Sequence, residues 1–262
     1  MNRPDIDGAL ARARGFVLER GQALDRARLA AGIGDAKRDV LLAEMLAGER
    51  ADGSFEIAGR GGLAGAMLAL ACLDEACAFD APVAARVIAR LESAQNEDGS
   101  WAPAPDSPDA TRLVVTGVVA GLVAKAACAR PKPLRLAGRF LAAHWGPERV
   151  QSGDYGAIAA FACFFANAGM ELADVGLQWC GRELERGYRT GRLTPLQTAR
   201  VLMLCDAYSL PGARLPIEDV IGSLLAGQAE DGGWFSMACD RELRVNATIE
   251  AAIAMRRFGQ RG

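Results

Sequence analysis

Along this chain, apolar side chains recur every three or four residues, which is the spacing of helices that bury one face. This spacing, together with the Gly, Pro and Asp signals that interrupt it, predicts eleven helices. The strict alternation of apolar and polar residues that marks a half-buried strand is absent. The sequence therefore predicts an all-α protein. The predicted helices cover residues 7–20, 35–48, 62–77, 82–95, 110–128, 133–145, 155–168, 171–187, 195–209, 216–227 and 246–258.

Two kinds of helix alternate along the chain. Helices such as 62–77, 110–128 and 155–168 are apolar almost all round, whereas those that precede them carry Arg, Glu or Lys on one face. A helix that is apolar all round is buried, and an amphipathic helix covers it. The alternation predicts an inner layer of helices inside an outer one. Nearly six such pairs can close on themselves and leave a central cavity that is open at one end.

One short phrase stands between paired helices. It reads ADGSF at 51–55, QNEDGSW at 95–101 and QAEDGGW at 228–234. Gly supplies the positive φ that ends the first helix of a pair, and Asp bonds to nearby backbone and starts the turn. We interpret Trp101 and Trp234 as packing wedges between adjacent repeats, because a large ring beside a tight turn is a packing device.

The phrase recurs at a regular interval. Gly53 and Gly99 are 46 residues apart, and the 133 residues from Gly99 to Gly232 make about three intervals of that length. Degenerate copies stand near the two missing points, at 151–155 and 190–194. Recurrence at a long fixed interval indicates a repeat architecture. We therefore expect one domain over residues 1–262, with about six helical hairpins.

Composition narrows the set of partners and compartments. The 262-residue chain is 51% hydrophobic, with a net charge of −2 and scattered Arg and Lys residues, so it has no electrostatic footprint for nucleic acid. Charged residues within 1–20 and the lack of a long apolar run predict neither a secretory segment nor an integral membrane segment. Seven cysteines, mostly in apolar helices, indicate reduced thiols without disulfides. We expect a cytoplasmic protein.

The phrase Gln-x-x-Asp-Gly-x-Trp, complete at 95–101 and 228–234, resembles the QW motif of the α/α-toroid superfamily. That superfamily contains class II terpene cyclases such as squalene-hopene cyclase and the β subunits of protein prenyltransferases. The resemblance implies an (α/α)6 toroid with a central cavity that holds a hydrophobic small-molecule substrate. It further implies a small terpene cyclase-like isomerase of secondary metabolism, which cyclises an isoprenoid by proton initiation.

The segment Asp106-Ser107-Pro108-Asp109-Ala110-Thr111 resembles the Asp-x-Asp-Asp acid motif of class II cyclases, although Ser107 and Pro108 separate its two aspartates. The resemblance implies that Asp109, helped by Asp106, is the catalytic proton donor. Protonation of an alkene needs a carboxylic acid that stays neutral, which a second carboxyl and a dry cavity provide. The alternative interpretation is that Asp109 only caps the helix that begins at Ala110.

Substrate-binding candidates stand where the inner helices begin, because these ends converge on one side of a toroid. Arg60 and Arg112 would hold a diphosphate or a carboxylate. Aromatic faces such as Phe165 would stabilise a carbocation. The full set of substrate-binding candidates is Arg60, Thr111, Arg112, Tyr155, Phe165, Asn246 and Glu250.

A catalytic metal is not predicted. Protein prenyltransferases bind zinc with an Asp-x-Cys sequence and a histidine, whereas this chain reads Cys239-Asp240 at the matching place. Its one histidine, His144, falls at the end of an outer helix. We expect no cofactor, with Mg²⁺ assisting only if the substrate is a diphosphate.

Two alternatives to an isoprenoid cyclase stay open. The first is a non-catalytic toroid that binds a hydrophobic small molecule or a partner protein. The second is a cyclase that acts on a non-terpenoid secondary metabolite. Class II cyclases usually carry a second helical domain that encloses the substrate, so a chain of this length is expected either to be a degenerate binding module or to complete its site with a partner chain or as a homo-oligomer.

Overall fold

The computed structural model describes residues 3–34, 38–151, 153–169, 173–235 and 241–259. In these ranges the regular structure is entirely helical, apart from isolated β-bridges, which confirms the all-α prediction. The helices are α1 (Arg3–Arg20), α2 (Ala23–Gly32), α3 (Arg38–Ala47), α4 (Gly62–Glu75), α5 (Pro82–Ser93), α6 (Asp109–Ala124), α7 (Pro131–His144), α8 (Pro147–Gln151), α9 (Tyr155–Ala168), α10 (Ala173–Arg189), α11 (Pro195–Leu204), α12 (Ile217–Ala226) and α13 (Arg241–Phe258).

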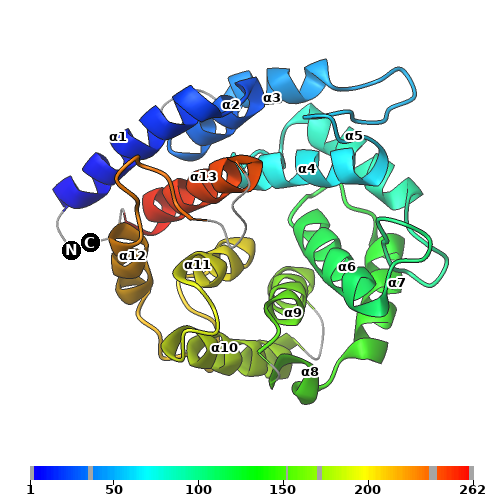
Figure 1. Cartoon of the computed structure of the whole chain (residues 1–262). Coiled ribbons are helices and arrows are strands. Elements are labelled where there is room, and N and C mark those ends of the chain that lie inside the picture. Colours follow the sequence, from blue (N-terminus) through cyan, green and yellow to red (C-terminus); the bar gives the residue numbers. More distant parts are fainter. Residues whose placement is uncertain (1–2, 35–37, 152, 170–172, 236–240, 260–262) are drawn as a thin grey trace.

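The helices form an inner and an outer layer (Figure 1). α4, α6, α9, α11 and α13 surround the centre of the molecule, and α1, α3, α5, α7, α10 and α12 lie outside them. The inner helices contact one another in chain order, from α4 through α6, α9 and α11 to α13. α2 contacts both α13 and α4 and lies between them in this succession. The chain thus places its apolar helices inside its amphipathic ones, as their side-chain patterns predict.

The tightest contact between inner helices depends on two glycines of α6. A Cβ atom on Gly117 would lie 2.6 Å from the Cβ of Ala160, and one on Gly121 would lie 2.5 Å from the sulfur of Cys163. Both positions on α9 are fully buried. α6 and α9 therefore pack backbone against backbone, which larger side chains on α6 would prevent.

The sequence pattern missed α2, the short α8 and several helix ends. α2 was missed because its ALDRARLAAG sequence interrupts the apolar spacing with charged residues. In the structure one of these, Arg28, is buried because it forms an ion pair with Glu75 of α4. α11 ends at Leu204, before the predicted end at residue 209, because Asp206 adopts a φ of 48°, outside the helical region.

The three DG turns share one backbone conformation. Their glycines Gly53, Gly99 and Gly232 have φ values of 75°, 88° and 87°. In each turn the preceding aspartate accepts a hydrogen bond from the backbone N–H two residues later, at 3.0, 3.0 and 3.2 Å. The positive φ and the local bond of Asp confirm the turn chemistry inferred from the sequence. The degenerate copies keep the glycine conformation, with φ values of 74° at Gly153 and 70° at Gly191.

Trp101 and Trp234 are buried and make matching hydrogen bonds. The indole N–H of Trp101 donates to the carbonyl of Leu91 at 2.7 Å, and that of Trp234 donates to the carbonyl of Leu224 at 2.8 Å. Each ring therefore joins its turn to the preceding outer helix, α5 or α12. This geometry fits the interpretation of both tryptophans as packing residues, although Trp234 also borders the 370 Å³ space described below.

Most of the described cysteines are in the core. Cys72, Cys163, Cys180 and Cys205 are buried, and Cys77 and Cys128 are exposed. All six are free thiols. Burial raises the pKa of Cys72 and of Cys180 to about 12, so these thiols stay protonated. None of the described helices combines the length and the apolar content needed to cross a bilayer.

Candidate functional site

Three adjoining spaces, lined mainly by inner helices and also by α12 and loop residues, together form what we call the central cavity. Their volumes are 370, 590 and 140 Å³, and Arg200 of α11 and Glu250 of α13 border all three. The two larger spaces lie toward the N-terminal ends of α4, α9, α11 and α13, as shown by the lining residues Gly62, Tyr155 and Thr194. A concave space of this size with a few polar groups is the usual setting of a small-molecule site.

Arg28 and Glu75 form a fixed ion pair on one wall of this cavity. The guanidinium of Arg28 donates two hydrogen bonds to the carboxylate of Glu75, at 2.8 and 2.5 Å. The two side chains are only 5% and 13% exposed. Burial lowers the pKa of Arg28, but the attraction of Glu75 outweighs it and the net shift is upward. Because both groups are used in this bidentate contact, we regard the pair mainly as a structural link between α2 and α4.

Arg200 and Glu250 form a looser pair at the centre. One guanidinium nitrogen of Arg200 lies 3.3 Å from the carboxylate of Glu250, and the side chain of Arg200 is 47% exposed. The side-chain N–H of Asn246 also donates to Glu250, at 3.1 Å. Arg200 therefore keeps N–H groups that face the cavity and have room for a ligand.

Tyr155, the first residue of α9, lines the same space as Arg200 and Glu250. Burial raises the pKa of its hydroxyl, which is partly opposed by the positive charge of Arg200. Its hydroxyl makes no hydrogen bond to the described part of the chain. Tyr155 thus offers a neutral O–H donor toward the cavity at physiological pH.

Apolar side chains make up much of the remaining walls. Trp234, Phe235 and Leu243 border the 370 Å³ space, with Leu196 and Leu224 beside them. The 140 Å³ space is lined largely by aliphatic side chains of α4, α6, α11 and α13, with Asp74, Glu75 and Arg257 also at its border. The aliphatic side chains include Met67, Leu70, Val118, Leu122, Met203 and Ile253. The cavity therefore combines a polar centre with apolar surfaces on both sides.

Arg60, Asn246 and Glu250 are the sequence-predicted residues, besides Tyr155, that border the cavity. Asn246 and Glu250 lie one turn apart on α13, at the centre. Arg60 lies at the edge of the 590 Å³ space, where it forms a 2.6 Å ion pair with Glu242. The structure thus brings Arg60, Tyr155 and the α13 residues Asn246 and Glu250, from three distant parts of the sequence, to the border of the central cavity.

Asp109 and Asp106 lie elsewhere. Asp109 is the first residue of α6, and its side chain is 75% exposed and 3.4 Å from Arg112. Asp106 and Thr111 are also exposed, and none of the three borders the central cavity described above. α6 begins one residue earlier than expected, with Pro108 in the cap position. The predicted cap role of Asp109 is therefore wrong, but an acidic residue in the first turn stabilises a helix, so this geometry favours a structural role for Asp109.

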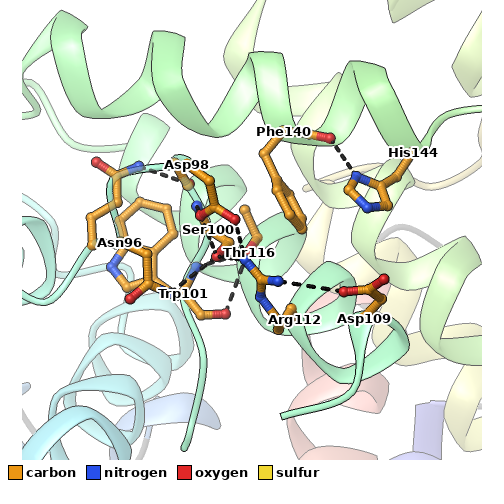
Figure 2. A network of polar contacts seen from close by, with 11 residues as sticks. Asn96, Asp98, Ser100, Trp101, Asp109, Arg112, Thr116, Phe140 and His144 are labelled. Atoms are coloured by element: carbon orange, nitrogen blue, oxygen red, sulfur yellow. Dashed lines mark hydrogen bonds and ion pairs between the residues drawn. The ribbon is translucent and has the colours of Figure 1, made fainter. Parts of the chain in front are cut away.

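Arg112 holds the second turn together instead of facing the cavity (Figure 2). It pairs with Asp98, donates to the hydroxyl of Ser100 at 2.9 Å, and lies over the ring of Phe140. Arg244 repeats this arrangement in the last turn, where it pairs with Asp231 at 2.6 Å and lies over the ring of Phe16. Two equivalent arginines in two repeats indicate a structural role for both.

Phe165 is a core residue between layers. It is 4% exposed and packs against Trp145, Phe161 and Phe164. A Cβ atom on Gly176 of the outer helix α10 would lie 2.4 Å from its ring. Phe165 was predicted to face a substrate. This prediction is wrong, because the ring points toward the outer layer.

Sequence reasoning missed the charged residues that dominate the cavity. Arg28, Glu75 and Arg200 belong to no recognisable motif. The available signal was an isolated charge inside an otherwise apolar helix, as at Arg200 among the apolar residues of α11. Such a charge is costly to bury without a partner, and its position therefore points to a paired or functional group.

A separate cluster closes the opposite end of the inner layer. The ammonium group of Lys125 lies 2.8 Å from both Asp74 and Asp206. Burial lowers the pKa of Lys125, but the two carboxylates outweigh burial and raise it. The cluster borders a 400 Å³ cleft and joins the ends of α4, α6 and α11. Since every charge here has an internal partner, we regard the cluster as structural.

Metal-ligand chemistry has little support in the described residues, which contain no group of three or more His, Cys, Asp and Glu side chains that could hold an ion. His144 lies at the end of the outer helix α7, where its Nδ1 is 2.8 Å from the carbonyl of Phe140. The Cys239-Asp240 sequence lies outside the described residues.

Comparison with known proteins bears on the fold alone. No protein-family model and no curated protein matches this chain. Among solved structures, the crystal structure of a protein from Actinoplanes is similar, with a TM-score of 0.64 and 13% sequence identity. The match covers 97% of this chain and 100% of that one. The arrangement of helices is therefore shared with a natural protein over nearly the whole length.

Proposed function

We propose that this protein is an α/α toroid that binds a small organic molecule, with a polar end and an apolar body, in its central cavity. The repeated turns, the inner and outer layers and the similarity of the turn phrase to the QW motif support the toroid. The observation that carries the proposed function is the position of Arg200 and Glu250, which border all three spaces of an otherwise largely apolar cavity.

A binding test can use the neutral fluorescent probe N-phenyl-1-naphthylamine. Ala71 lines two of the three spaces, so Ala71→Phe would fill part of the cavity. We expect saturable probe binding that this variant weakens by about ten-fold, equivalent to about 1.4 kcal/mol. The matched control is Ala143→Phe on the exposed side of α7, which should bind as the wild type does. Absence of binding, or equal binding by both variants, would refute the proposal.

Proton-initiated cyclisation of an isoprenoid is the second candidate function. It is favoured by the two complete turn phrases and by the largely aliphatic lining of the 140 Å³ space. Proton donation to an alkene needs a carboxyl group without a cationic partner, whereas Glu75 and Glu250 each pair with an arginine. For this reason we place small-molecule binding, or chemistry on a non-terpenoid metabolite, ahead of cyclisation.

Incubation with geranyl, farnesyl and geranylgeranyl diphosphates and with squalene, followed by mass spectrometry, tests this second candidate. A cyclised product that the Asp109→Asn variant no longer forms would establish Asp109 as the acid despite its exposure. A product formed equally by both proteins would place the acid elsewhere. If none of the four substrates gives a product, the cyclisation proposal fails and small-molecule binding remains the proposed function of this cavity.

A further inference from the structure

We propose that the corner formed by Arg200, Tyr155 and Gln197 recognises a single carboxylate, so that the ligand is a monocarboxylic acid with an apolar body and not a diphosphate. This inference rests on the proposed function and names the chemistry of the ligand. It follows from three features of the cavity: the pairing of its arginines with carboxylates, its free hydrogen-bond donors and the apolar surfaces next to them.

Carboxylates outnumber arginines by one among the residues that border the two larger spaces. The arginines are Arg28, Arg60 and Arg200, and the carboxylates are Asp25, Glu75, Glu242 and Glu250. Each arginine has a carboxylate partner, at 2.5 Å for Arg28, 2.6 Å for Arg60 and 3.3 Å for Arg200. Diphosphate sites need several cationic groups that are not already neutralised. Among the described residues the two larger spaces lack such groups, so a highly charged headgroup would not be stabilised there.

Arg200 differs from the other arginines in its spare hydrogen-bonding capacity. Arg28 makes two short hydrogen bonds to its partner, whereas Arg200 has one 3.3 Å contact and a half-exposed side chain. A guanidinium carries five N–H donors in a planar fork that matches the two oxygens of a carboxylate. Arg200 can therefore keep its contact with Glu250 and still bind one carboxylate from the cavity side.

Two neutral donors accompany Arg200. The hydroxyl of Tyr155 has no hydrogen-bond partner in the described part of the chain and stays protonated. Gln197 accepts a 2.9 Å hydrogen bond from the backbone N–H of Thr194 through its side-chain oxygen, which leaves its amide N–H group for a ligand. One cation with neutral donors suits a monoanion better than a dianion.

The apolar body of the ligand has a surface on which to lie. Trp234, Phe235 and Leu243 border the same 370 Å³ space as Arg200, and the largely aliphatic 140 Å³ space also borders Arg200. A chain of methylene groups attached to the carboxylate would gain free energy by leaving water for either surface. The combination predicts an amphipathic acid of moderate length.

The test compares decanoate, decyl phosphate and 1-decanol as competitors of N-phenyl-1-naphthylamine near neutral pH. We expect decanoate to bind at least about ten-fold more tightly than the other two, the size of effect that charge-assisted hydrogen bonds produce. Arg200→Gln should remove this preference, and Tyr155→Phe should reduce it. The matched control Arg189→Gln, on the outer helix α10 and 54% exposed, should retain it.

The competition results distinguish failure of the carboxylate inference from failure of the proposed binding function, on which the inference rests. If none of the three competitors and no probe binds, the proposed function fails. If 1-decanol competes as well as decanoate, or decyl phosphate binds most tightly, the cavity binds molecules but the carboxylate inference is wrong. Because Arg200→Gln leaves Glu250 without its cation, the double variant Arg200→Gln/Glu250→Gln serves as a second test. It should also lack the preference while it still binds 1-decanol.

Discussion

The side-chain amide of Gln228 donates a 2.9 Å hydrogen bond to the backbone carbonyl of Ala9. This bond joins the last DG turn to the first helix, 219 positions earlier in the chain. The second turn uses the same device, since Gln95 donates to the carbonyl of Pro133 at 2.9 Å. The glutamine of each complete phrase therefore fixes its turn to the next outer helix, and in the last repeat this helix is the first one of the chain.

Gln228→Ala should destabilise the protein by removing the link between the two ends of the chain. Its amide N–H also donates to Gly232 within the turn, so two partly buried acceptors lose a partner. We expect a loss of about 1–2 kcal/mol in the free energy of unfolding, measured by urea denaturation. Gln178→Ala, at an exposed position of α10, is the control and should change little. Equal stability of both variants would contradict the proposed role of Gln228.

Thr116→Val tests how the tryptophan turns are attached to the inner helices. The hydroxyl of Thr116 accepts a 2.9 Å hydrogen bond from the backbone N–H of Trp101, and Thr248 does the same for Trp234 at 3.1 Å. Valine would leave a buried N–H without a partner, at a cost of about 1–3 kcal/mol. Thr116→Ser keeps the hydroxyl and should retain more of the stability. A valine variant as stable as the serine variant would show that this bond contributes nothing.

The buried pair of Arg28 and Glu75 should be far more sensitive to the loss of one partner than to the loss of both. Arg28→Met leaves an uncompensated carboxylate and should cost about 3–5 kcal/mol. Arg28→Met/Glu75→Leu removes both charges and should recover much of that loss. Thermal denaturation of the wild type, the single and the double variant measures this coupling. Additive losses in the double variant would mean that the two groups do not act as a pair.

Stability should fall in acid partly through Asp231. The hydrogen bonds that Arg244 donates hold the pKa of this carboxyl below its ordinary value. A carboxyl with a lowered folded pKa stabilises the fold above the unfolded pKa of about 3.9 and loses that contribution as the pH falls through the folded pKa. The stability difference between wild type and Asp231→Asn should therefore be present at about pH 6 and shrink toward about pH 2. An undiminished difference in acid would contradict this assignment. Asp7→Asn, at an exposed position of α1, controls for a general effect of charge.

Local sequence signals predicted the layers and turns well, because the residues that determine each turn lie close together in the sequence. A DG dipeptide fixes a turn through φ and a short-range hydrogen bond, and Trp101 needs only the neighbouring helices to be buried. The missed helix α2 shows the limit of this reasoning. Its Arg28 looks like a surface residue until Glu75, 47 positions away, neutralises it.

The cavity could be predicted only in part for the same reason. Tyr155, Asn246 and Glu250 were found because they stand near the starts of inner helices, and those starts converge. Asp109 and Arg112 stand at such a start too, but Arg112 turns back to its own DG turn, where Asp98 offers a closer partner than any group in the cavity. Which way a side chain turns at a helix start depends on partners that are distant in the sequence.

A crystal structure with 10-bromodecanoate tests most directly whether the central cavity is a ligand site, because the bromine locates the end of the apolar chain by its anomalous signal. The account predicts a bromine peak inside the inner layer, beside Met67, Leu122 or Ile253 or against Trp234, with the carboxylate on Arg200. A bromine peak only on the outer surface, or a ligand whose carboxylate contacts neither Arg200 nor Tyr155, would contradict it.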